Sequence, residues 1–137
     1  MITLQVGVKA FLKNKSGKFL FLHRSAEKYK GTKGSWDIVG GRIDPGTELI
    51  ENLKREVREE TALEINSKPE LIYAQDILLT EKERHVVRLT YTANVDGEPV
   101  LDTSENDQYR WLSIEEVRKQ ADLDIYVKEI IDLGLLK

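Results

Sequence analysis

The stretch GRIDPGTELIENLKREVREETAL, which runs from Gly41 to Leu63, decides the fold of this chain. Apolar residues recur in it at helical spacing, with Leu53 and Val57 at the centre of the apolar side. A DPG turn signal precedes this run, and Thr47 is a suitable N-cap residue. We therefore predict an amphipathic helix over residues 47–62 that packs against a sheet.

The same helix carries a cluster of carboxylates. At about 100° per residue, Glu56, Glu59 and Glu60 fall on one side of the helix, and Glu60 lies inside the apolar arc. Carboxylates that repel one another and begin to be buried need a cation, and an all-oxygen set favours magnesium or manganese over zinc. The alternative from the helix alone is a solvated charge ladder formed by Glu51, Arg55 and Glu59.

The remaining segments predict an α/β protein in one domain, residues 1–137. Runs rich in β-branched, leucine and aromatic residues predict strands at 2–12, 18–24, 36–39, 71–79, 85–95 and 109–112. The first two runs are separated by an NKSG turn and should form a hairpin. A capping box at Ser113 starts one C-terminal helix, and a second should run over 125–133 until Gly134. Strands with helices interspersed predict a mixed β-sheet packed between helices.

Composition excludes several classes of protein. The chain is 40% hydrophobic and 33% charged, as in an ordinary globular protein. It has no cysteine, which excludes disulfides and cysteine-rich zinc sites. The net charge of −3 argues against a nucleic acid polymer as the main partner. No apolar run is long enough to cross a membrane and no signal peptide is evident, so a cytoplasmic location is the default expectation.

The segment from Gly41 onward resembles the Nudix box, whose pattern is G-x5-E-x7-R-E-U-x-E-E-x-G-U, where U is a bulky aliphatic residue. The positions that match at the right spacing are Gly41, Arg55, Glu56, Val57, Glu59, Glu60 and Leu63. LFLHR in the second predicted strand, SWDIVGG before the box and YRWLSIEEV near the C-terminus also look like family features. The resemblance therefore covers most of the chain.

This resemblance implies a Nudix-type α/β/α sandwich that hydrolyses a diphosphate bond in a nucleoside diphosphate linked to another group. It assigns Mg²⁺, with Mn²⁺ as a substitute, to Glu56, Glu59, Glu60 and the main-chain carbonyl of Gly41. Nucleoside triphosphates, including modified ones, are the first substrate expected, and ADP-ribose or a dinucleotide is the alternative. A hypothesis of another class is a binding module that senses a nucleotide without cutting it. Homodimers are common on this scaffold, and the sequence leaves the oligomeric state open.

Two positions depart from the box pattern. Thr47 stands where the family has the glutamate that pairs with the box arginine, and Ala62 stands where it has glycine. Ala62 requires a backbone that avoids positive φ or accepts strain. The arginine needs another partner, for which the candidates are Glu51, Glu48 and Asp44.

Other residues are candidates for catalysis and substrate binding. The box residues Arg55, Glu56 and Glu59 are counted as catalytic, and a further acid outside the box could accept the proton from water. Glu105 is the first choice for this acid and Glu83 the second.

Substrate contacts are expected from three other positions. Arg24 and Arg42 are candidate phosphate contacts, because a guanidinium matches phosphate geometry. Trp36 could stack on a base, although core packing is the more common role of such a residue. A lip over the substrate could be formed by Lys28, Lys30 and Lys33, and His23 and His85 are expected to be structural.

Overall fold

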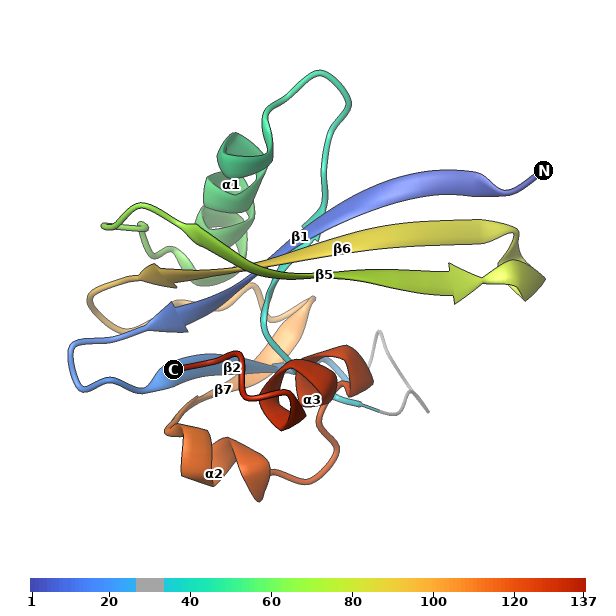
Figure 1. Cartoon of the computed structure of the whole chain (residues 1–137). Helices are drawn as coiled ribbons and strands as arrows, with labels where there is room; N and C mark the ends of the chain where they lie inside the picture. The colour runs from blue at the N-terminus through green and yellow to red at the C-terminus, as the bar shows by residue number, and fades with distance from the viewer. Residues whose placement is uncertain (27–33) are drawn as a thin grey trace.

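The computed structural model describes residues 1–26 and 34–137, and in this part of the chain seven strands form one sheet. The strands are β1 (Thr3–Lys13), β2 (Phe19–Arg24), β3 (Trp36–Asp37), β4 (Val39–Arg42), β5 (Glu70–Leu79), β6 (Arg84–Asn94) and β7 (Asn106–Leu112). The helices are α1 (Leu49–Thr61), α2 (Ile114–Arg118) and α3 (Ile125–Asp132), with a 3₁₀ turn η1 (Thr80–Lys82) between β5 and β6. The helix α1 lies on one side of the β1, β6 and β5 layer, and α2 and α3 lie on the other (Figure 1).

The sheet is mixed, as predicted. Its strands follow the order β3-β2-β1-β6-β5, while β4 pairs with β1 and β7 pairs with β2. The central pair, β1 and β6, is parallel over eleven residue pairs, and the other pairs are antiparallel. The predicted α/β/α sandwich with a mixed sheet is therefore confirmed.

Strict alternation along β1 and β2 produces a core on each side of the sheet. Val8, Leu12 and Leu20 face α1 together with Leu53 and Val57, the centre of the apolar side of that helix. The intervening residues of β1 and β2 contribute Phe11, Phe19 and Phe21 to a second core under α2 and α3. Since adjacent strand residues point to opposite faces, these two strands hold both layers of helices at once.

The predicted hairpin between the first two strands is confirmed only at its turn. The side chain of Asn14 accepts hydrogen bonds from the backbone N–H groups of Ser16 and Lys18 and closes the turn. Beyond the pair Lys13 and Phe19 the strands separate, because β4 occupies this edge of β1 over residues 7–10. β2 pairs instead with β3 and β7.

The single strand predicted over residues 36–39 is wrong, because the structure divides this segment into β3 and β4. Gly40 and Gly41 lie inside β4 rather than after a strand. Gly40 has φ 147°, and a Cβ at this position would lie 2.1 Å from the carbonyl oxygen of Val8. Only glycine permits so close a pairing of β4 with β1.

The prediction that Thr47 caps the first helix is also wrong. The N-cap residue is Glu48, which makes no side-chain capping bond. The fully buried Asn52 holds the preceding loop instead: its Nδ2 donates to the carbonyls of Thr47 and Glu48, and its Oδ1 accepts from the N–H of Asp44. Because a side chain inside the helix satisfies these polar groups, the helix begins later than the capping rule suggests.

The other helix boundaries agree with the sequence patterns. Ser113 and Glu116 form the predicted capping box of α2, and Asp124 caps α3 by accepting bonds from the N–H groups of Tyr126 and Val127. The chain ends its last helix before Gly134, which has φ 70°.

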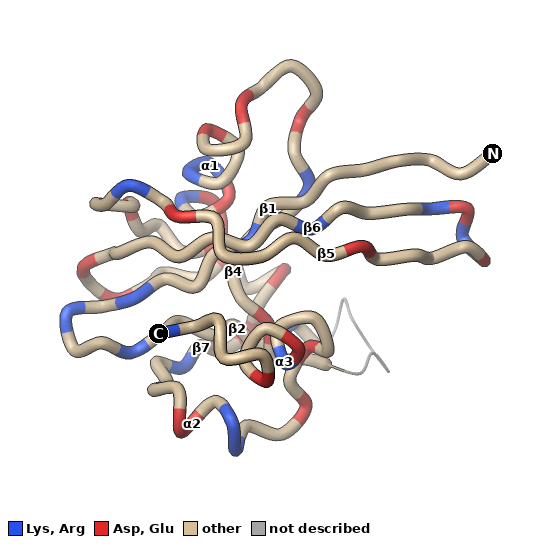
Figure 2. The backbone as a smooth tube through the Cα atoms, in the orientation of Figure 1, with Lys and Arg blue, Asp and Glu red and all other residues tan. Residues whose placement is uncertain are grey.

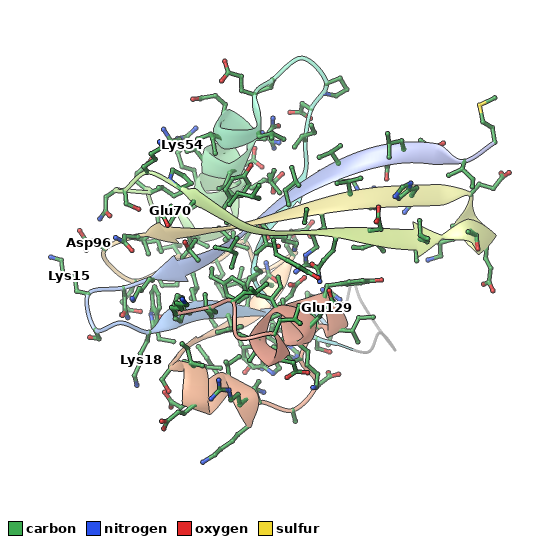
Figure 3. The ribbon with its side chains drawn as sticks, in the orientation of Figure 1. Lys15, Lys18, Lys54, Glu70, Asp96 and Glu129 are labelled. Carbon is green, nitrogen blue, oxygen red and sulfur yellow. The ribbon has the colours of Figure 1, made fainter. Side chains whose placement is uncertain are left out.

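Charged residues of both signs are spread over the described part of the chain (Figure 2). Among the residues labelled in Figure 3, Lys15 and Asp96 form an exposed ion pair at 3.8 Å near the β1–β2 turn. Glu129 on α3 accepts a hydrogen bond from Gln75 of β5. No helix in the described residues is long and apolar enough to span a membrane.

Candidate active site

The three box carboxylates line one hollow of about 340 Å³ at the edge of the sheet. α1 contributes Glu56, Glu59 and Glu60, β4 contributes Gly40 and Gly41, and the loop before β7 contributes Asp102 and Glu105. The strand and the helix follow each other in sequence, but the loop lies beyond β6, so the tertiary fold brings its two acids to this hollow. Five carboxylates around one hollow make it suited to a cation.

Gly41 allows the backbone of β4 to lie directly against a carboxylate of α1. A Cβ at Gly41 would be 2.8 Å from both carboxylate oxygens of Glu56. The side chain of Glu56 is only 14% exposed. Burial raises the pKa of this carboxyl, the charge of Arg55 opposes the rise, and the charge of Glu59 adds to it.

Arg55 stands between the acids as their counter-ion. Its Nη1 donates to Glu56 Oε1 at 3.1 Å and to Glu59 Oε2 at 3.3 Å. Its Nη2 lies 3.5 Å from Asp44 Oδ2 and donates to Asn52 Oδ1. Asp44, one of the three candidates, therefore supplies the carboxylate from outside the helix that Thr47 does not.

Glu60 is the box carboxylate whose charged form is disfavoured most by burial. Burial raises its pKa from 4.5 to about 7, against the opposing effects of Lys9 and the N–H of Gly40. The Gly40 N–H donates to Glu60 Oε2 at 2.9 Å, and Asn106 Nδ2 donates to Oε1 at 3.4 Å. A carboxyl held by two donors in a site that disfavours its charge would gain from a nearby cation.

The donor set fits a divalent cation, although no three acidic or histidine side chains in the described residues converge on one point as they stand. Arg55 bonds to two of the acids and takes the place of a cation between them. All the available ligands are oxygen atoms, which suits a hard cation such as Mg²⁺. The space over Gly41 that a Cβ would fill keeps the Glu56 carboxylate beside the β4 backbone.

Comparison with known proteins agrees with this geometry. The family model described as NUDIX domain matches residues 3–133. The chain belongs to the Nudix family. Members of this family hydrolyse pyrophosphate bonds in nucleoside diphosphate derivatives, so the chain is a Nudix hydrolase that acts on small nucleotide substrates.

Solved structures of Nudix proteins resemble the chain over nearly its full length. The MutT protein from Methanosarcina mazei Go1 is 26% identical, with a TM-score of 0.80 over 96% of this chain and 92% of that protein. The MutT NUDIX hydrolase from Burkholderia pseudomallei is 19% identical, with a TM-score of 0.79 over 95% and 97% of the two chains. A NUDIX hydrolase from Nitrosomonas europaea is 25% identical, with a TM-score of 0.73 over 95% and 87%. No curated protein sequence matches the chain significantly.

The Nudix hollow is completed by two acids outside the box. Glu105, the first choice for a proton acceptor, lines it together with Asp102, which sequence reasoning missed. The backbone of this loop is held in place because Ser25 N–H donates to the Glu105 carbonyl. Glu83, the second choice, lies at the turn after η1, where it binds the amino group of Met1, and does not line the hollow. A run of loop acids before the last strand was the signal that could have included Asp102.

Arg24 belongs to a cluster of buried charges beside the Nudix hollow. Its Nη2 lies 2.7 Å from Asp37 Oδ2 and 3.2 Å from Asp124 Oδ1. Lys9 and Arg88 also bind Asp37, and Arg88 binds Asp124. Burial would raise the pKa of Asp37, but the three cations outweigh burial and hold the pKa well below its usual value. The cluster links β3 and the start of α3 to β1, β2 and β6. The contact predicted between Arg24 and a substrate phosphate stays a prediction.

Trp36 packs in the core under α2 and α3 and is only 6% exposed. His23 contacts its ring at 5.0 Å, and the guanidinium of Arg110 lies 4.5 Å from the ring centroid. Little of the indole is left exposed for a base to stack on. His23 and His85 each pair with an aspartate, as expected of structural residues. The lysine loop predicted as a lip, with Lys28, Lys30 and Lys33, lies outside the described residues.

Ala62, the second departure from the Nudix box, has a strained backbone conformation. Ala62 ends α1 in the left-handed conformation with φ 60°, and its N–H donates to the carbonyl of Arg58. This is the strained alternative of the two that the sequence allowed, since an alanine Cβ crowds the backbone there. Thr61 supports the turn by donating from its hydroxyl to the Val57 carbonyl.

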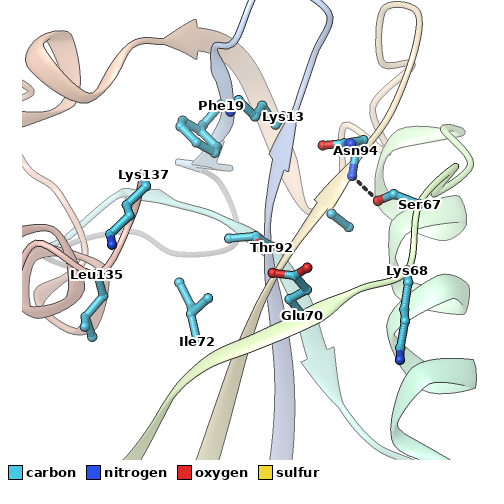
Figure 4. A pocket seen from close by; sticks show the side chains of 11 residues that line it. Lys13, Phe19, Ser67, Lys68, Glu70, Ile72, Thr92, Asn94, Leu135 and Lys137 are labelled. Carbon is cyan, nitrogen blue, oxygen red and sulfur yellow. Dashed lines mark hydrogen bonds between the residues drawn. The ribbon is translucent and has the colours of Figure 1, made fainter.

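A second hollow, of about 360 Å³, is lined in part by the C-terminal residues Leu135 and Lys137 (Figure 4). Its charged lining residues are Lys13, Lys68, Lys137 and Glu70. A single carboxylate among three lysines is not a cation site. The hollow at Gly41, with its five carboxylates, suits a cation better.

Proposed function

We propose that this Nudix protein is a Mg²⁺-dependent pyrophosphohydrolase whose first substrates are nucleoside triphosphates, including modified ones. The observation that carries the proposal is the approach of the Glu56 carboxylate to Gly41 inside the acidic hollow. Mg²⁺ would be held by Glu56, Glu59, Glu60 and the carbonyl of Gly41. Mn²⁺ is expected to substitute, because it prefers the same oxygen ligands.

The residues of the hollow have different roles in hydrolysis. A bound divalent cation supplies neutralisation of phosphate oxygens and activation of water. Glu105 accepts the proton of the attacking water, since it lines the hollow from the loop before β7 and not from the helix that carries the metal ligands. Arg55 neutralises the charge of Glu56 and Glu59 by donating to both carboxylates. Arg42, exposed at the end of β4 beside Gly41, contacts a phosphate of the bound nucleotide.

The test is product release from a panel of nucleoside triphosphates, ADP-ribose and dinucleoside polyphosphates with Mg²⁺ or Mn²⁺. Glu59→Gln should abolish metal-dependent turnover, whereas Glu51→Gln on the exposed face of the same helix should not. Turnover of ADP-ribose or dinucleotides in preference to triphosphates would replace the first substrate by the alternative. Metal-dependent nucleotide binding without any turnover would show a sensing module instead.

Glu105→Gln separates the proton acceptor from the metal ligands. We expect kcat to fall by about a hundredfold or more, as for a general base, with the affinity for Mn²⁺ unchanged. A parallel Asp102→Asn variant is the matched control from the same loop. A larger loss of kcat in Asp102→Asn than in Glu105→Gln would assign the role to Asp102.

A further inference from the structure

A groove of about 300 Å³ adjoins the acidic hollow at Gly41. It follows the face of the sheet opposite α1, and its wall is apolar, formed by Ile77, Leu79 and Val86. Its volume is at the lower end of the range for small-molecule sites. The part of a substrate that extends beyond the scissile diphosphate would enter this groove.

Gly7 forms the floor of the groove. It is paired with Arg42 of β4 on one edge of β1 and with Arg88 of β6 on the other. Residues opposite each other in a ladder share a face, so two arginines flank the place where Gly7 has no side chain. The backbones of β4 and β6 are about 10 Å apart across two strand spacings, which leaves room for a ring system between them.

Two arginines on this face have no acidic partner among the described residues. Arg88 is neutralised by Asp37 and Asp124. Among the residues that the structure describes, neither Arg42 nor Arg84 forms an ion pair, although exposed acids are abundant elsewhere. These two arginines, at the outer end of the groove, are called the arginine pair below.

The arginine pair can reach one common point. Arg84 pairs with Thr3 and Arg42 with Gly7, so both share the groove face of β1. Four residues along β1 and two strand spacings across it put their backbones about 16 Å apart, a span that two extended arginine side chains can close with an anion between them. Partial desolvation lowers the pKa of the exposed Arg42 and the charge of Arg84 lowers it further, in agreement with their proximity. Like charges held together favour a shared anion.

We infer that the arginine pair binds a phosphate that the substrate carries in addition to the diphosphate that is cut. The connecting nucleoside lies over Gly7 against the apolar wall, and the guanidinium groups of Arg42 and Arg84 match the phosphate oxygens. This inference rests on the proposed function, because it names the substrate class of the same site. The substrate class is a nucleotide derivative with a separate phosphomonoester.

Binding to the metal-free protein tests the inference without hydrolysis. Calorimetry compares AMP with adenosine 3′,5′-bisphosphate and adenosine 2′,5′-bisphosphate, and the better of the two bisphosphates distinguishes the position of the extra phosphate. We expect the extra phosphate to tighten binding by about tenfold, as for a charge-assisted hydrogen bond. Arg84→Gln should remove this gain, and Arg118→Gln, an equal loss of charge on α2, should keep it. Equal binding of AMP and both bisphosphates to the wild type would overturn the inference.

Gly7→Ala tests the path of the nucleoside. A Cβ at Gly7 would lie 3.6 Å from the Gly41 carbonyl oxygen and 3.9 Å from Val86 Cγ1, which is ordinary contact. The variant should therefore fold normally while its methyl group fills the floor of the groove, and all three probes should bind it more weakly. Unchanged binding of every probe, with an unchanged Tm, would show that the nucleoside does not lie over Gly7 and would overturn the inference.

Hydrolysis then separates this inference from the proposed function. The substrates are matched pairs that differ by one ribose phosphate, such as ADP-ribose with and without a 2′-phosphate. A preference in kcat/KM for the phosphorylated member, lost in Arg84→Gln, supports the inference. Hydrolysis of both members alike by wild type and Arg84→Gln would refute the inference and leave the hydrolase intact. Failure to hydrolyse any substrate, with the bisphosphate still bound through Arg84, would refute the proposed function alone.

Discussion

Replacing Glu60 by Gln should stabilise the metal-free protein at alkaline pH and remove its response to Mg²⁺. Burial raises the pKa of Glu60 from 4.5 to about 7 in the folded protein. In the unfolded chain this carboxyl loses its proton near its ordinary pKa, so the folded state binds more protons between the two values. The contribution of Glu60 to stability is therefore fully present below the lower pKa and is lost as pH rises through the higher one.

The size of this loss follows from the shift in pKa. A rise from 4.5 to about 7 corresponds to about 3 kcal/mol between the two protonation states. Partial exposure and relaxation of the site reduce this to about 1–3 kcal/mol in practice. Gln stays neutral at every pH, and it keeps an oxygen to accept from the Gly40 N–H while Asn106 can turn its own oxygen toward the new amide.

Urea unfolding in EDTA at about pH 5 and about pH 8.5 measures the effect through linkage. The free energy of unfolding of Glu60→Gln relative to wild type should increase by about 1–3 kcal/mol from the lower to the higher pH. The free energy of unfolding of Glu51→Gln, on the exposed face, should not change relative to wild type. Mg²⁺ at a hundred times its Kd should stabilise the wild type by about 2.7 kcal/mol and leave Glu60→Gln unchanged. A gap between wild type and Glu60→Gln that is the same at both pH values would refute the reasoning.

Three further outcomes are expected. Ala62→Gly should raise the free energy of unfolding by about 0.5–1 kcal/mol, because it relieves a left-handed alanine; a loss of stability in urea titrations would contradict this. Gly41→Ala should weaken Mn²⁺ binding by at least about tenfold, the effect expected when an outer contact of a ligand is lost. The reason is that the new Cβ displaces the Glu56 carboxylate. An unaltered Mn²⁺ affinity, measured by electron paramagnetic resonance, would exclude this contact. Asp44→Asn should lower kcat/KM severalfold, and adding Thr47→Glu, the family residue, should restore it; the absence of rescue would mean that the box arginine needs no acid in this loop.

The box helix and its carboxylates could be predicted from local sequence. Helical periodicity placed Leu53 and Val57 in the core and Glu60 within the buried arc, and the structure confirms both because a helix fixes its own angular positions. The capping box at Ser113 was equally local. The start of α1 was not predictable from capping rules, because the bonds that hold its loop come from the buried Asn52, three residues inside the helix.

Tertiary structure decided which distant residues meet. Sequence alone determined the residue types at the site: the spacing of the box predicts a row of oxygen ligands, and composition excludes cysteine ligands. Asp102, the two separate strands β3 and β4, and the pairing of Arg24 with Asp37 and Asp124 depend on strand register and loop packing. These contacts join segments up to 100 residues apart, and no local periodicity encodes them. The sequence determines which ligand atoms the helix carries, and the packing of the sheet and loops determines which other residues face the helix.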